Sequence, residues 1–131
     1  MVTVEGKIKG KARPRMTKTG HTYTPQDTVN YENWVRLCYK QQSNKKLEGS
    51  IQATIIAYFA VPKSYSKTKR LDCVLNNLRP TKKPDADNIA KIILDSLNGI
   101  AYDDDSQIVE LTVIKNWTDE QERVEFNLNA L

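Results

Sequence analysis

Residues 51–60, IQATIIAYFA, form a run of β-branched, aromatic and small apolar side chains. On an extended strand, one face would carry Ile51, Ala53, Ile55, Ala57 and Phe59. A run with this composition and length is typical of a strand that is covered by other parts of the fold. We therefore predict a well-buried strand over residues 51–60, around which the rest of the core is arranged.

Two helices are predicted beside this strand. For the first, Thr24 is a natural N-cap, Pro25 suits the first helical position and Asp27 lies at capping-box spacing, with an end expected near residues 43–44. The second is predicted from about Ala86 to Asn98, with Gly99 following as its C′ residue.

The remaining segments complete a small mixed fold. Residues 2–8 predict an opening strand, and alternating apolar residues over 109–113 and 124–128 predict an antiparallel hairpin. Residues 61–82 are polar and basic with a weak helical pattern in their middle. The expected order is β, α, β, (α), α, β, β, an α/β-type (mixed α+β) single domain over residues 1–131 with helices packed on one mixed sheet.

Composition narrows the classes of protein. With 39% hydrophobic and 27% charged residues, the chain has material for a modest core, and no apolar run approaches the roughly 18 residues of a membrane span. The first residues lack the apolar segment of a secretory signal, so we expect a cytoplasmic protein without membrane contact. Cys38, Cys73 and the one histidine, His21, suggest neither a zinc site nor disulfides.

Charge is distributed unevenly along the chain. Residues 7–18 carry six basic and no acidic side chains, and residues 61–84 carry seven basic side chains against Asp72 alone. From Asp85 to Glu110 the sign reverses, with seven carboxylates and one basic residue, Lys91. Taken alone, either basic run is more often a solvent-exposed face than a binding surface. Together they indicate a surface for a polyanion with a cation-binding hole in it.

The acidic segment places carboxylates at two points. Asp85 and Asp87 lie at the start of the second helix, and Lys91 follows Asp87 at the i, i+4 spacing that lets side chains meet. Asp104 and Asp105 begin the next strand, after a short loop. If strand and helix pack side by side in the right register, these carboxylates converge.

Converging carboxylates repel one another unless a cation compensates them. Mg²⁺ prefers oxygen ligands and is typically held by one or two carboxylates with substrate phosphates, so we expect Mg²⁺, with Mn²⁺ able to replace it. The chemistry implied is phosphodiester hydrolysis, with Lys91 stabilising charge or protonating the leaving oxygen. Taken singly, each element has another interpretation, because Asp85 or Asp87 suits a helix cap, Lys91 an ordinary ion pair and residues 103–105 a solvated turn.

The motifs Asp85-Ala86-Asp87-Asn88, Lys91 and Asp104-Asp105-Ser106-Gln107 resemble the DxDN, lysine and DDxQ pattern of the RusA family of Holliday junction resolvases, small dimeric endonucleases of bacteria, phages and prophages. The resemblance implies that Asp85, Asp87 and Asp105 are essential metal ligands. It implies an auxiliary role for Asp104 and a catalytic or DNA-contacting role for Lys91. Tyr23-Thr24-Pro25 is a looser match, and Pro84 stands where some members carry arginine.

The expected partners are branched, four-way DNA and a second copy of the chain, because an isologous dimer matches the two-fold symmetry of a junction. Dimer contacts are expected at the strand over 51–60 or at the carboxy-terminal hairpin. Tyr23, Tyr65 and Tyr102 are possible stackers on unpaired bases, although packing is the commoner role. The basic side chains expected on DNA phosphates are Lys7, Lys9, Lys11, Arg13, Arg15, Lys18, Lys67, Lys69, Arg70, Lys82 and Lys83.

Two other functions remain open at this point. One is a module that binds structured nucleic acid without cutting it, and the other is a metal-dependent nuclease for flaps, forks or RNA. The sequence does not distinguish one metal ion from two, and it does not give a base preference at the cut. It also leaves open recombination, replication repair and phage DNA processing.

Overall fold

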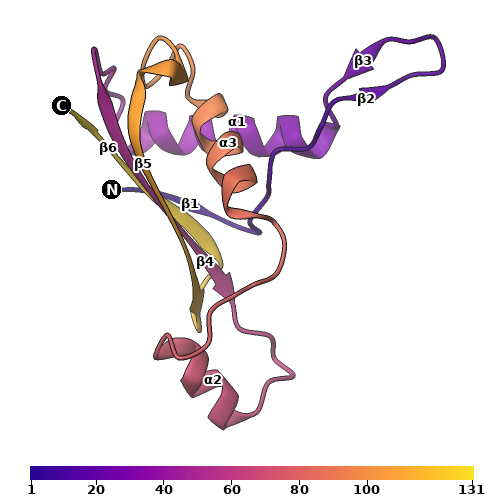
Figure 1. The fold of residues 1–131 in the computed structure, drawn as a ribbon, viewed down its shortest axis with the longest axis vertical. Coiled ribbons are helices and arrows are strands. Elements are labelled where there is room, and N and C mark those ends of the chain that lie inside the picture. Colours follow the sequence, from indigo (N-terminus) through magenta and orange to yellow (C-terminus); the bar gives the residue numbers. More distant parts are fainter.

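The computed structural model describes residues 1–131 and contains a four-stranded mixed sheet with the order β1-β6-β4-β5. Its strands are β1 (Val2–Glu5), β4 (Ile51–Ala60), β5 (Ile108–Thr118) and β6 (Arg123–Ala130). β4 pairs with β5 in parallel and with β6 antiparallel, and β6 also pairs antiparallel with β1. Figure 1 shows that helices α1 (Gln26–Gln42) and α3 (Ala86–Ser96) lie on the same side of this sheet. The predicted mixed α+β fold is confirmed.

The core lies between the sheet and the two helices. β4 occupies a central position, and its alternate residues Ile51, Ala53, Ile55, Ala57 and Phe59 are buried, as its pattern predicts. From α3, the apolar side chains Ile89, Ile92, Ile93 and Leu97 are fully buried against this face, and Tyr31, Val35 and Cys38 contribute from α1. The core therefore fixes α3 alongside β5, which is the arrangement that decides where the carboxylates go.

The first helix begins one residue later than expected. Its N-cap is Pro25, with no side-chain cap hydrogen bond, so the predicted capping by Thr24 is wrong. Asp27 instead accepts a hydrogen bond from the backbone N–H of the next residue, Thr28. The end of α1 at Gln42, with Ser43 as its C-cap, agrees with the prediction.

The predicted antiparallel hairpin of the last two strands is wrong, because β4 lies between β5 and β6. The four-residue connection over 119–122 crosses the end of β4 instead of forming a tight turn between neighbours. Glu122 secures this crossing, since its two carboxylate oxygens accept hydrogen bonds from the backbone N–H groups of Ala60 and Ile8. Both strands exist as predicted, but β4 inserts between them.

Two smaller units project from this body. A hairpin of β2 (Arg15–Met16) and β3 (Thr22–Tyr23), which the sequence did not predict, forms an arm in the amino-terminal basic loop. Helix α2 (Lys67–Val74) confirms the weak helical pattern of residues 61–82, with the Ser66 side chain as its N-cap. Figure 1 shows the arm and α2 at opposite ends of the molecule, with the N-terminal end of α3 between them.

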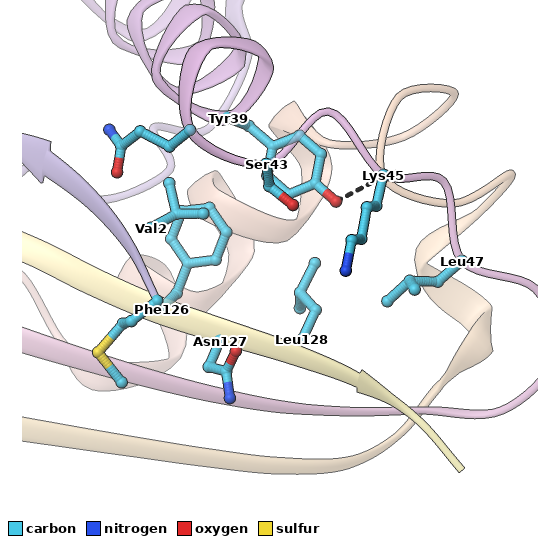
Figure 2. A pocket seen from close by; sticks show the side chains of 10 residues that line it. Val2, Tyr39, Ser43, Lys45, Leu47, Phe126, Asn127 and Leu128 are labelled. Atoms are coloured by element: carbon cyan, nitrogen blue, oxygen red, sulfur yellow. Dashed lines mark hydrogen bonds between the residues drawn. The ribbon is translucent and has the colours of Figure 1, made fainter.

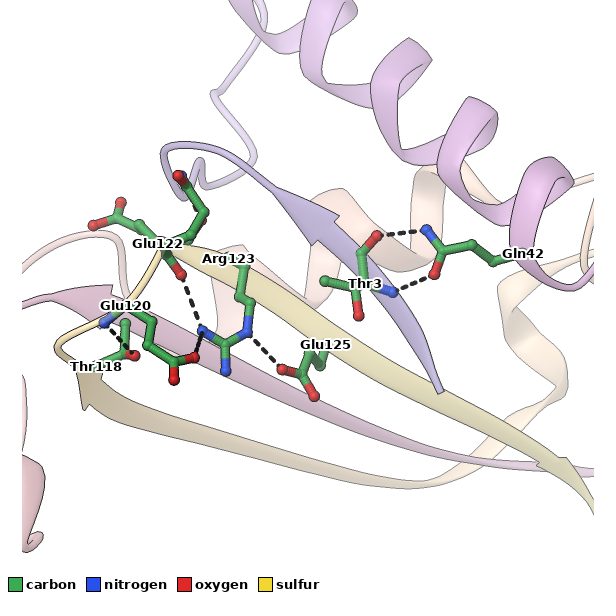
Figure 3. A network of polar contacts seen from close by, with 8 residues as sticks. Thr3, Gln42, Thr118, Glu120, Glu122, Arg123 and Glu125 are labelled. Atoms are coloured by element: carbon green, nitrogen blue, oxygen red, sulfur yellow. Dashed lines mark hydrogen bonds and ion pairs between the residues drawn. The ribbon is translucent and has the colours of Figure 1, made fainter.

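The face of the sheet away from α1 and α3 carries a polar network (Figure 3). Arg123 donates to Glu125 at 2.6 Å and also lies over the ring of Tyr58. A separate contact in Figure 3 joins the sheet to α1, where the side chain of Gln42 makes a pair of hydrogen bonds with the backbone of Thr3 on β1. Because Arg123 and Glu125 satisfy each other, the face away from the helices is suited to solvent. None of the helices has the length and apolar character needed to cross a membrane.

Candidate active site

Asp85 is the N-cap of α3 by position, but its side chain makes no cap hydrogen bond. Its carboxylate faces outward and receives the ammonium of Lys83, with Nζ–Oδ distances of 2.8 and 2.9 Å. Asp87, in the first turn, is exposed. Helix capping therefore does not account for Asp85, and two carboxylates are available at the positive end of the helix dipole.

Lys91 lies one turn beyond Asp87 and is exposed. The six ion pairs of the structure include none between Asp87 and Lys91. The interpretation of Lys91 as an ordinary ion-pair partner of Asp87 therefore finds no support in the geometry. Its ammonium remains free for another anion.

Lys115 on β5 adds a cation that the sequence did not single out. Its Nζ donates to the carbonyl of Lys82 at 2.6 Å. Partial burial lowers the pKa of this ammonium, while the charge of Asp85 acts in the opposite direction. The contact links the middle of β5 to the segment that leads into α3.

The second acidic group is held by a short helical turn, η1 (Asp105–Gln107), at the start of β5. Asp104 caps this turn by accepting from the backbone N–H of Ser106, while Gln107 accepts from the N–H groups of Asp103 and Asp104. The hydrogen bonds from Ser106 lower the pKa of Asp104. Gln107 also donates to the carbonyl of Gly49. The DDxQ motif thus builds a reciprocal capping box that fixes the two aspartates.

The carboxyl group of Asp105 lies next to that of Asp95, which belongs to the last turn of α3. Partial burial, the neighbouring Asp95 carboxyl and the charge of Asp104 together raise the pKa of Asp105. Asn98 fixes the backbone here by accepting a hydrogen bond from the N–H of Asp105 at 2.8 Å. Carboxylates gathered in this way favour a cation or a proton between them.

Lys11 neutralises part of this second group from the other side. Its ammonium lies 2.9 Å from an oxygen of Glu32 and 3.6 Å from an oxygen of Asp95, and only 20% of its side chain is exposed. We predicted Lys11 as a phosphate contact, but in the structure it is occupied within the chain. Sequence reasoning missed Asp95 and Glu32, although Asp95 follows Lys91 by four residues on the same side of α3.

The two carboxylate groups do not converge within one chain. Asp85 and Asp87 lie at the N-terminal end of α3, whereas Asp104 and Asp105 lie beside Asp95 at its C-terminal end. Eleven residues of α-helix separate these ends by roughly 16 Å. Accordingly, no set of three or more Asp, Glu, His or Cys side chains is arranged to hold one metal ion.

Eight of the eleven predicted DNA-binding side chains fall into two clusters; of the other three, Lys7 is exposed, Lys9 is half-buried and Lys11 is paired as described above. We call the first the arm cluster, because it lies on and beside the β2–β3 hairpin, and we call the second the α2 cluster. All members of the arm cluster and most of the α2 cluster are exposed. Arg70 is the half-buried exception, donating to the carbonyl of Pro62. The arm cluster comprises Arg13, Arg15 and Lys18, and the α2 cluster comprises Lys67, Lys69, Arg70, Lys82 and Lys83.

Other candidate features lie outside the acidic groups. Tyr102 is fully buried, with its hydroxyl donating to the Leu94 carbonyl, so it cannot stack on a base.

A pocket of about 120 Å³ between the end of α1 and β6 is lined by Tyr39, Leu47 and Phe126 among others (Figure 2). It contains no acidic side chain, and its only charged residue is Lys45. It is therefore not the catalytic centre.

Comparison with known proteins identifies the family of this chain. Residues 5–129 match the family model described as endodeoxyribonuclease RusA. The uncharacterized protein YqaN of Bacillus subtilis (strain 168) is 36% identical over 124 residues, which cover 90% of this chain and 87% of that protein. Because the family model spans nearly the whole domain, this chain belongs to the RusA family of endodeoxyribonucleases.

Proposed function

We propose that this protein is a Mg²⁺-dependent endodeoxyribonuclease that resolves four-way DNA junctions, in recombination and repair, and that it acts as a homodimer in the cytoplasm. The observation that carries the proposal is the acidic pair at the start of α3, whose carboxylates do not cap the helix and whose only ion pair is the exposed one between Lys83 and Asp85. Asp85 stands at the N-cap without capping the helix, and Asp87 is exposed beside it. In an endodeoxyribonuclease family, carboxylates that the helix does not use for capping are the natural ligands of a catalytic cation.

The donor set fits Mg²⁺ and does not fit zinc. Asp85, Asp87, Asp104 and Asp105 offer only carboxylate oxygens, which hard divalent cations prefer, and neither cysteine nor His21 is near them in sequence. Such an ion supplies Lewis-acid activation of the scissile phosphate and lowers the pKa of the attacking water. The carboxylates hold and orient it, and the exposed Lys91 provides a positive charge for the phosphate oxygens.

The separation of roughly 16 Å along α3 restricts how the four aspartates can act together. A single ion is bound by ligands about 2 Å away, so Asp85 and Asp105 of one chain cannot share it. A second copy of the chain resolves the difficulty if the Asp85 end of one protomer meets the Asp105 end of its partner. Two-fold symmetry then creates two equivalent composite sites.

The free edge of β5 is the surface that suits this arrangement. β4 lies inside the sheet, so the expected dimer contact through residues 51–60 has no free edge to use, and of the last two strands only β5 is at an edge. On β5, Val109 and Leu111 are 57% and 48% exposed. A long apolar edge strand is a ready template for pairing with another chain.

Antiparallel pairing of β5 with its copy also gives the required placement. The Lys115 carbonyl points away from β4, because the Arg79 side chain binds it from outside. Since backbone groups alternate along a strand, those of Val109, Leu111 and Val113 point outward too. Pairing centred on Leu111 brings Asp105 toward the partner's Lys115, and Asp85 lies close enough to Lys115 to influence its pKa.

The test is cleavage of an end-labelled four-way junction by purified protein in Mg²⁺ or Mn²⁺. We expect symmetric nicks in opposite strands at rates well above those on flap, linear duplex or RNA substrates of equal length. If the protein binds the junction at low salt but cuts nothing in either metal, it is a binding module and the nuclease proposal fails. Faster cleavage of a flap or RNA would retain the nuclease and reject junction resolution.

A further inference from the structure

A pocket of about 220 Å³, which the nuclease proposal does not use, lies between α2 and the distal end of β5. Its aromatic walls are Tyr65 and Trp117, whose ring centroids are 6.1 Å apart with the planes at 69°. Lys69, Arg79 and Lys82 line it as well, and no carboxylate does. The pocket therefore combines flat aromatic surfaces with charged side chains that are all positive.

This lining selects the chemistry of a ligand. Three cations without an acid disfavour a cationic ligand and attract an anionic one. The Lys69 ammonium lies 3.9 Å from the centroid of the Tyr65 ring, so a single lysine side chain covers one face of that ring. Because Lys69 is an exposed, flexible side chain, it can move aside. Arg79 uses Nε and Nη2 on the Lys115 carbonyl and keeps Nη1 free.

The size and position of the pocket narrow the ligand further. The pocket is too small for a duplex, so only a single residue of a strand can enter it. Lys82 lies in its wall, its carbonyl accepts from Lys115, and Lys83 next to it contacts Asp85. Only three residues of the chain therefore separate Asp85 from the pocket wall, so a DNA strand held at Asp85 can reach the pocket within a few nucleotides.

We propose that this pocket binds one unstacked nucleobase of the DNA strand held at Asp85, with its flanking phosphates on Lys69 and Lys82. This inference rests on the proposed nuclease function. Aromatic side chains stack on any base through its π-face, and cations around them hold the backbone. A free phosphate would explain the cations but would leave the pair Tyr65 and Trp117 without a role. Four-way junctions supply such bases at the crossover, where stacking is interrupted.

Trp117 allows a direct test without cleavage. The chain has two tryptophans, and Trp34 lies on α1 outside the pocket, so a Trp34→Phe variant reports on Trp117 alone. In EDTA, we would titrate this variant with an eight-nucleotide strand of thymidines and with an eight-residue strand of the same sugar phosphates lacking bases. Fluorescence anisotropy of labelled strands measures binding separately from the tryptophan signal.

We expect the thymidine strand to quench Trp117 saturably and the baseless strand to bind without quenching. Adding Tyr65→Ala should weaken thymidine binding at least about fivefold, as loss of one base stack does. Tyr58→Ala is the matched control, because Tyr58 also lies under a cation, Arg123, but on the opposite face of the sheet, and it should change nothing.

Three outcomes would overturn the inference. Equal quenching by both strands would assign the pocket to phosphate alone. Binding by anisotropy without any quenching would show that the pocket stays empty, and the nuclease proposal would stand. If neither strand nor a four-way junction bound, this inference and the proposed function would both be rejected.

Discussion

The ammonium of Lys83 lies 2.8 Å from one carboxylate oxygen of Asp85 and 2.9 Å from the other. It occupies the place where the proposed function requires a divalent cation, so lysine and metal compete for the same oxygens. The pair is well exposed, with 84% of the Lys83 and 48% of the Asp85 side chain accessible, and such pairs contribute about 1 kcal/mol at most.

Lys83→Ala should therefore strengthen metal binding slightly. We expect a change of less than about 0.5 kcal/mol in the free energy of unfolding and Mn²⁺ binding that is tighter by up to about fivefold, measured by calorimetry without DNA. Lys82→Ala is the control, because Lys82 makes no ion pair, and its Mn²⁺ affinity should not change. Weaker Mn²⁺ binding by Lys83→Ala would contradict this competition.

Asp87→Asn should separate binding from cleavage. The change removes one metal-binding carboxylate but leaves the exposed arm and α2 clusters intact, so junction affinity should stay within about twofold. We expect the cleavage rate to fall at least about 100-fold, because metal ions contribute several kcal/mol to phosphoryl transfer. Gel-shift assays in EDTA and single-turnover cleavage in Mg²⁺ measure the two effects. Near wild-type cleavage would show that the assigned site is wrong.

Most of the fold follows from local patterns in the sequence. The strand at 51–60 and the end of α1 were predicted to the residue or nearly so, because the spacing of apolar residues is a local property. The separation of β5 from β6 was not predicted, because it depends on β4 entering between them and on Glu122 holding the end of β4 from a distance along the chain. The arm at 15–23 has too few residues in strands to give a pattern.

The candidate site was less accessible to sequence reasoning than the fold. The motifs locate Asp85, Asp87, Asp104 and Asp105, but spacing along the chain does not say which end of α3 each group occupies. Lys11 illustrates the limit as well, since its place in a basic run suggests phosphate binding while the fold pairs it with Glu32 and Asp95.

Asp105→Asn should change the pH dependence of stability in EDTA. Because partial burial, Asp95 and Asp104 raise the pKa of Asp105, the folded chain binds this proton more tightly than the unfolded chain, whose pKa is about 3.9. The protonated Asp105 side chain therefore stabilises the folded chain fully below the unfolded pKa of about 3.9. This contribution is lost as the pH rises through the raised pKa of the folded chain. The variant should melt higher than wild type near pH 7.5 and equally near pH 4.

Thermal melts followed by circular dichroism at both pH values provide the measurement. Asp103→Asn is the control, because Asp103 is highly exposed and paired with Lys46, and its effect should not grow with pH in the same way. An Asp105→Asn protein that melts lower than wild type near pH 7.5 would show that the carboxylate stabilises the folded chain, contrary to the contacts described.

Gln107→Ala should disturb the acidic loop without unfolding the domain. The side chain accepts from two backbone N–H groups and donates to the carbonyl of Gly49, so its loss should cost about 1–2 kcal/mol. Because it positions Asp104 and Asp105, we also expect metal affinity or cleavage to fall by about 10–100-fold. Gln121→Ala, at an exposed position in the connection between β5 and β6, should do neither.

The pairing of β5 edges predicts which variants lose the dimer. Leu111→Pro removes an outward backbone N–H that β4 does not use, and proline is tolerated on an edge strand, so the protomer should fold. We expect this variant to be monomeric in analytical ultracentrifugation and inactive, whereas Leu111→Ala, which keeps the N–H, should remain a dimer. A dimeric Leu111→Pro protein would rule out this edge as the interface.

Mixed dimers test whether each site is shared between protomers. Asp85→Asn and Asp105→Asn homodimers should both be inactive, because each lacks one carboxylate in both sites. If Asp85 of one protomer works with Asp105 of its partner, a heterodimer of the two variants contains one site with both carboxylates intact and one with neither. Co-refolding the two variants should therefore restore nicking of one strand per junction, at up to half of the wild-type rate per dimer. If each site were built within one chain, every site in the mixture would lack a carboxylate, and the mixture would remain inactive.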